Sequence, residues 1–238
     1  TRSYRRWFPT ALATVVALEL FSANMATNAA PLSDPYPELP LLEAIQSDDA
    51  SGRWFRVQDD ARMQGHWACA YGLHEWGGIS PIRLQTWNDF DSHAPERARF
   101  GLLGIDYLIS WKMDFVTREG IPLQTKTLYH GTAPSGEAKV YRLSGDAQRA
   151  WLPETVQHVT SKQALWEMMA IEGFDAHQNA LLLAPSQAMD SSTGHVKLLS
   201  ERPGRIELQV HNKLPALLVV SETWYPGWIA TRYGCESL

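Results

Sequence analysis

Residues 100–111 read Phe-Gly-Leu-Leu-Gly-Ile-Asp-Tyr-Leu-Ile-Ser-Trp, and this stretch decides the fold class. Its first part is typical of an apolar helix turn, and residues 105–111 have the composition of a buried strand. Further along the chain, strand-like runs at 125–130 and 138–143 flank the turn 131–136 and predict a hairpin. A helix turn that leads into a strand and then a hairpin indicates an α+β fold.

Other elements follow from the pattern on either side of this stretch. We expect helices at 41–47 and 161–171, the second with Ser161 as its N-cap, and a strand at 53–57. Strand-like runs at 181–184, 196–200, 205–212 and 216–221 predict an incomplete antiparallel β-sandwich. The prediction is therefore a mixed α/β region over 41–180 and a truncated β-sandwich over 181–238.

The N-terminal segment joins a basic cluster to an apolar run. Arg2, Arg5 and Arg6 precede residues 7–21, and the apolar stretch has about the 20 residues that a membrane helix needs. We predict a transmembrane helix within 1–29, with a secretory signal peptide cleaved near 27–29 as the alternative. Residues 30–40 contain four prolines and predict a stiff linker. Either alternative places the rest of the chain outside the cytoplasm.

Composition limits the classes of partner. The 238 residues are 45% hydrophobic and carry a net charge of -5, with Lys and Arg scattered along the chain, which argues against nucleic acid as a partner. The two cysteines, Cys69 and Cys235, leave their redox state open. Because the chain begins at Thr1 and stops soon after a strand-like run, we expect it to be a fragment of a longer protein.

One group of side chains could bind a metal. His66, Cys69 and His74, with Glu75 beside them, lie within ten residues, but their spacing matches none of the usual zinc arrangements. A packed, turn-rich segment that contains histidines is the simpler interpretation. We predict no metal site here and no cofactor.

A second group carries carboxylates. Asp89, Asp91 and Glu96 could in principle perform acid–base chemistry on a glycosidic bond, although neighbouring carboxylates more often form a solvated surface. The sequence lacks a nucleophile elbow, a phosphate-binding loop and a dinucleotide-binding fingerprint. We therefore predict no catalytic residues.

Tryptophan is the unusual component, with ten residues. Their rings can stack on sugars or fill a core, and we favour packing while retaining glycan contact as the alternative. The candidates for glycan contact are Trp67, Trp76, Trp87, Trp224 and Trp228.

Residues 219–231, Val-Val-Ser-Glu-Thr-Trp-Tyr-Pro-Gly-Trp-Ile-Ala-Thr, closely resemble the C-terminal signature of YfhO-type bacterial membrane proteins. This family is grouped with the GT-C glycosyltransferases, which use polyprenyl-linked sugars. Weaker similarities occur in order at 53–57, 71–73, 77–81, 102–110, 140–141 and 149–151, and residues 7–28 resemble the last helix before the external domain. Residues 232–235 and the missing aromatic at Ile79 depart from the family pattern.

The resemblance implies a location and a role. It places the soluble part on the extracytoplasmic side of the bacterial plasma membrane, held by a single span, with the GT-C catalytic carboxylate upstream of Thr1. This part would then be non-catalytic, and its partners would be the membrane and a polyprenyl-linked sugar or an envelope glycan.

Two alternatives remain. One is a secreted carbohydrate-binding or envelope-interaction domain with a cleaved signal peptide. The other is a metal-dependent hydrolase built on His66, Cys69, His74 and Asp89.

Overall fold

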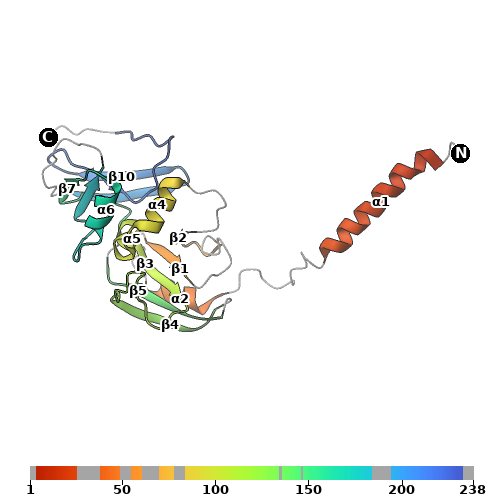
Figure 1. Ribbon diagram of the computed structural model, residues 1–238, viewed down its shortest axis with the longest axis horizontal. Coiled ribbons are helices and arrows are strands. Elements are labelled where there is room, and N and C mark those ends of the chain that lie inside the picture. The colour runs from red at the N-terminus through yellow and green to blue at the C-terminus, as the bar shows by residue number, and fades with distance from the viewer. Residues whose placement is uncertain are drawn as a thin grey trace. The chain divides into compact units, whose positions relative to one another are not determined.

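The structure is a computed structural model that describes residues 4–25, 38–48, 55–60, 70–77, 84–133, 136–145, 147–183 and 194–232. The chain divides into two compact units, Thr1–Pro37 and Glu38–Leu238. The first contains α1 (Tyr4–Met25), drawn in red in Figure 1, and the second contains all the other helices and strands. This division falls within the predicted linker, whereas the predicted boundary at residue 180 stays a prediction.

Helix α1 is 22 residues long with Pro9 inside it. The Thr14 hydroxyl donates to the Thr10 carbonyl at 2.9 Å, and the Ser22 hydroxyl donates to the Glu19 carbonyl at 3.0 Å. Over the part of the chain that the structure describes, no helix combines the length and apolar character needed to cross a bilayer. This finding does not support the transmembrane helix predicted within 1–29.

A five-stranded mixed sheet forms the centre of the second unit, in the order β2-β1-β3-β5-β4. Strand β1 (Arg56–Asp59) pairs in parallel with β2 (Glu75–Trp76) and β3 (Ile105–Ser110). Strands β4 (Thr125–Ala133) and β5 (Gly136–Leu143) form the expected hairpin, and β5 pairs antiparallel with β3. All six residues of β3 are buried, which confirms the buried strand predicted from residue 105.

Both faces of β3 are covered, and this explains its unbroken apolar run. Tyr107 and Ile109 pack with Leu41, Leu42 and Ile45 of α2 (Pro40–Asp48). On the other face, Leu108 packs in a cluster with two residues of the helix that precedes the strand and with Phe115, Tyr141 and Leu143. A strand buried on both faces has no solvent side on which polar residues would alternate.

The helix before β3 is α5 (Glu96–Leu103), which follows α4 (Gln85–His93). It ends at Gly104, whose φ of 63° and ψ of 41° are left-handed. This conformation stops the helix within one residue, because glycine adopts it without the steric cost of a Cβ. The switch from helix to strand predicted within 100–111 is therefore confirmed.

The described residues of the C-terminal half form three two-stranded sheets. Strand β6 (Ala150–Trp151) pairs with β11 (Val219–Val220), and β7 (Thr155–His158) pairs in parallel with β8 (Asn179–Leu182) across α6 (Lys162–Met169). Strands β9 (His195–Arg202) and β10 (Arg205–His211) form an antiparallel ribbon. Ser161 caps α6 as expected, but β8 pairs with an earlier strand, so the described strands differ from the expected sandwich.

Candidate functional site

Of the four side chains considered as metal ligands, the structure describes two, His74 and Glu75. His66 and Cys69 lie outside the described residues, His74 is exposed, and Glu75 lies in β2. Among the residues with a described position, no group of three or more His, Cys, Asp and Glu side chains could hold a metal ion. The expected absence of a metal site stays a prediction for the complete chain.

The three carboxylate candidates are engaged in ion pairs. Asp89 accepts a hydrogen bond from the Lys162 ammonium at 2.7 Å, and this bond lowers the pKa of Asp89. Arg99, whose side chain is buried, contacts Asp91 and lies 2.9 Å from Glu96. Asp91 therefore connects α4 to α5 and Asp89 connects α4 to α6, whereas Glu96 pairs within α5.

The tryptophan candidates separate into packed and exposed residues. Trp76 and Trp87 contact each other with ring centroids 3.8 Å apart and pack against the cluster around Phe100. Trp224 is 70% exposed, whereas Trp228 is half-buried and packs edge-on against Tyr225 at 6.1 Å. Trp67 lies outside the described residues. Among the four candidates that the structure describes, Trp224 is therefore the one with a mostly exposed ring, as a sugar-stacking platform requires.

Sequence reasoning missed one exposed aromatic residue. Trp111 was included in the buried strand, but β3 ends at Ser110 and the Trp111 side chain is 63% exposed. An apolar run gives no sign of where it leaves the core, so the error lies at the boundary of the element.

Four of the segments that resemble the YfhO-type family, 53–57, 102–110, 149–151 and 219–231, meet at one partly buried polar cluster. Arg56 donates to the Ser221 hydroxyl at 2.9 Å, to the Ser221 carbonyl at 3.0 Å and to the Leu103 carbonyl at 2.9 Å. Arg149 donates to Glu201 at 2.9 Å, to Glu222 at 2.5 Å and to the Ser221 carbonyl. We call Arg56, Arg149, Glu201, Ser221 and Glu222 the arginine cluster.

In the arginine cluster, two guanidinium groups lie close together and are balanced by two carboxylates, which indicates a structural role. Burial and the neighbouring charge of Arg149 lower the pKa of Arg56 to about 10, and Glu201 and Glu222 oppose this effect. The two carboxylates compensate for two guanidinium groups placed close together. Because the donors point at protein acceptors, the cluster joins β1, the end of α5, β9 and the segment after β11.

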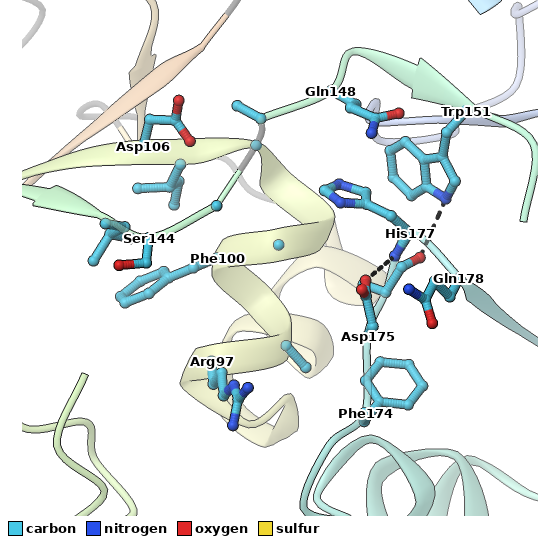
Figure 2. A pocket seen from close by; sticks show the side chains of 18 of the residues that line it. Arg97, Phe100, Asp106, Ser144, Gln148, Trp151, Phe174, Asp175, His177 and Gln178 are labelled. Carbon is cyan, nitrogen blue, oxygen red and sulfur yellow. Dashed lines mark hydrogen bonds between the residues drawn. The ribbon is translucent and has the colours of Figure 1, made fainter. Parts of the chain in front are cut away.

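A cleft of about 1190 Å³ lies beside α5 and is lined by polar, charged and aromatic side chains. In the view of Figure 2, Phe100 and Ser144 stand on one side, and Trp151, His177 and Gln178 stand on the other. Its lining provides one guanidinium group, three carboxyl groups, three amides, two imidazoles and three aromatic rings. The corresponding residues are Arg97, Asp106, Glu154, Asp175, Gln124, Gln148, Gln178, His177, His195, Phe100, Trp151 and Phe174.

One wall of the cleft is held by specific contacts. The Trp151 indole donates to the Ala176 carbonyl at 3.2 Å, and the Asp175 carboxylate accepts from the His177 backbone N–H at 2.8 Å. The His177 ring packs edge-on against Trp151, with centroids 4.7 Å apart. These contacts hold the segment 174–178 in place, so its polar side chains have a fixed framework behind them.

The lining suits a ligand with many hydroxyl groups. Amides donate and accept hydrogen bonds, guanidinium groups donate them, carboxylates accept them, and aromatic rings offer an apolar face. Sugars present the same combination of hydroxyl groups and apolar C–H faces. Comparison with known protein families, with curated proteins and with solved structures finds no match to this chain.

Proposed function

We propose that residues 38–238 form a non-catalytic, extracytoplasmic domain that binds a cell-envelope glycan in the cleft beside α5. The observation that carries this proposal is the lining of the cleft, in which Arg97, three glutamines and three carboxylates accompany aromatic rings. The net charge of -5 agrees with a sugar ligand rather than a polyphosphate.

We further propose that the domain serves a YfhO-like membrane protein, which transfers sugars from a polyprenyl carrier to an envelope acceptor. Its part would be to hold the acceptor glycan. The support is the sequence resemblance together with the arginine cluster, where residues from its 53–57, 149–151 and 219–231 segments converge. In this chain, Arg56 and Arg149 from these segments contact Ser221 and Glu222 of the 219–231 segment, which is a structural role that a shared pattern could preserve.

The glycan-binding proposal can be tested by titrating the protein with oligosaccharides from bacterial envelope polymers and following amide chemical shifts. We expect shifts at residues 97–101 and 173–178. Gln178→Ala should weaken binding several-fold, since it removes a donor and an acceptor from the cleft. Gln157→Ala is the matched control, because Gln157 is exposed on β7 and does not line the cleft. Equal effects of the two substitutions, or shifts confined to other regions, would contradict the proposal.

The non-catalytic role has a separate test. The purified protein is mixed with a polyprenyl-phosphate-sugar donor and an envelope acceptor, and transferred sugar is measured. We expect no turnover. Measurable transfer by this chain alone would overturn the non-catalytic part of the proposal and leave the glycan site untouched.

A secreted glycan-binding domain is the second candidate. The exposed rings of Trp224 and Tyr225, 70% and 48% exposed, favour it because a free aromatic surface can stack on a polymer without a catalytic partner. Mass spectrometry of the mature protein separates the two candidates. A new N-terminus near Ala30 supports secretion, and an intact N-terminal segment supports the YfhO-like arrangement.

A further inference from the structure

Two histidines face each other across the β9–β10 ribbon. His195 and His211 are direct partners in the antiparallel register. Their rings lie with centroids 4.7 Å apart and an interplanar angle of 24°, and both residues are exposed. Neither residue belongs to the candidate sites derived from the sequence.

We propose that His195 and His211 together bind a divalent transition-metal ion such as Zn²⁺ or Ni²⁺, with water in the remaining positions. Imidazole nitrogen is a preferred ligand for these ions, at about 2.0–2.1 Å for zinc. Side chains of direct cross-strand partners have Cβ atoms about 4.5–5.5 Å apart, so two imidazoles can reach one ion. The exposed rings need only rotate from their stacked arrangement to turn a nitrogen of each toward the same point.

The backbone beside the pair is fixed. A Cβ on Gly194 would lie 2.2 Å from the His211 carbonyl oxygen and 2.7 Å from the Asn212 side-chain oxygen, so the two strand ends approach closely there. This close approach holds the two imidazoles at the same level of the ribbon. Because the backbone pairing already brings the two side chains together, binding one ion costs less conformational entropy than it would for two unpaired residues.

The site lies at the rim of the cleft and next to a lysine. His195 is part of the cleft lining, so a metal ion here would have open positions for a ligand that enters the cleft. Lys197, two residues along β9, pairs with Gln209, and both are exposed. The charge of Lys197 opposes a bound dication and therefore offers a way to change the affinity without touching the ligands.

The test is calorimetric titration of the full chain with Zn²⁺ and, separately, Ni²⁺ under reducing conditions. Replacing either histidine by alanine should reduce the affinity of one site at least about 10-fold, because a direct ligand matters at least as much as an outer-shell group. If the two imidazoles share one ion, His195→Ala, His211→Ala and the double variant should lose the same site to the same extent. Additive losses would mean two independent single-histidine sites and would overturn the proposal.

Matched controls keep the test specific. His130→Ala and His158→Ala remove other exposed histidines and should leave this site unchanged. Lys197→Glu should strengthen metal binding several-fold by reversing the neighbouring charge. Thermal unfolding of each variant without metal verifies that the ribbon still folds. Equal metal binding by the wild-type chain and by a folded His195→Ala variant would also overturn the proposal.

Discussion

At the scale of single residues, Asp48 occupies an unfavourable position that its partners compensate. It is the last residue of α2, where the helix dipole disfavours a carboxylate. Arg142 lies 2.6 Å away, Lys126 3.3 Å away, and the Tyr107 hydroxyl donates at 3.1 Å. Burial raises the pKa of Asp48, but hydrogen bonds from Lys126 and Tyr107 and the charge of Arg142 outweigh it and leave the pKa lowered.

Replacing Asp48 with asparagine should therefore destabilise the fold by about 1–3 kcal/mol at pH 7, since Arg142 and Tyr107 lose a charged acceptor. A lowered folded pKa contributes stability that is present above the unfolded value of about 3.9 and is lost as pH falls through the folded value. Urea unfolding from pH 7 to pH 3 should show a shallower acid loss in Asp48→Asn. Asp114→Asn, an exposed control, should keep the wild-type slope. An unchanged slope in Asp48→Asn would contradict this assignment.

The arginine cluster gives the second residue-scale prediction. Arg149→Met should cost about 3–5 kcal/mol, because it leaves Glu201 and Glu222 without their partner while the Arg149 side chain is only 3% exposed. Arg149→Lys should be intermediate, since an ammonium cannot form the forked contacts of a guanidinium. Arg205→Met is the control, because the Arg205 side chain is 69% exposed and its pair with Glu207 is worth at most about 1 kcal/mol. The measurement is the free energy of unfolding in urea. Equal losses of stability in Arg149→Met and Arg205→Met would show that the arginine cluster contributes no more than an exposed ion pair.

Sequence reasoning could not have found this cluster as a contact. Arg56, Arg149 and Glu222 are separated by long stretches of chain, and their residue types are common on surfaces. Only the resemblance drew attention to their segments. The same limit applies to the tryptophans, since composition counts the rings but does not say that Trp76 and Trp87 face each other while Trp224 faces solvent.

At the scale of elements, the change from helix to strand at Gly104 could be predicted from the sequence because it depends on the backbone conformation of one glycine. Its left-handed conformation is one that residues with a Cβ adopt at a cost of about 1–2 kcal/mol. Gly104→Ala should destabilise the fold by at least that amount, as measured by urea unfolding.

Gly101→Ala is the matched control for this prediction. Gly101 lies inside α5, and a Cβ there would meet the Ala176 Cβ at 3.6 Å, which is ordinary contact. Alanine in a helix interior is favoured over glycine by about 0.5–1 kcal/mol, so this variant should be neutral or more stable. Destabilisation of both variants to the same degree would mean that space, rather than the backbone conformation, limits this turn.

Pairing between elements was less accessible to sequence reasoning. The helix 161–171 and the strand near 181 were both expected, yet the parallel pairing of β8 with β7 across α6 was not. Residues 150–159 contain Pro153 and read only as extended, so nothing marked β7 as the partner. Local pattern identifies an element, whereas its neighbour in the sheet depends on contacts that are distant in sequence.

At the scale of the whole molecule, the α+β class could be predicted from the sequence, whereas no described helix is long and apolar enough to support the predicted membrane span. Seven large apolar side chains among the described residues of α1 are 45–72% exposed: Trp7, Phe8, Leu12, Val15, Val16, Leu18 and Leu20. Exposed apolar surface of this kind promotes association in water.

The division after Pro37 therefore predicts two independent effects of removing residues 1–37. The free energy of unfolding of residues 38–238 should stay within about 0.5 kcal/mol of that of the full chain, because these residues form a compact unit of their own and contributions from independent parts add. Self-association should fall, because the exposed apolar side chains of α1 leave with the segment. Urea unfolding measures the first effect and sedimentation velocity in the absence of detergent measures the second. Loss of cooperative unfolding in the shortened chain would show that the second unit needs the first in order to fold. Unchanged self-association would indicate that other exposed apolar side chains cause it, such as Trp224 and Ile229 near the C-terminus.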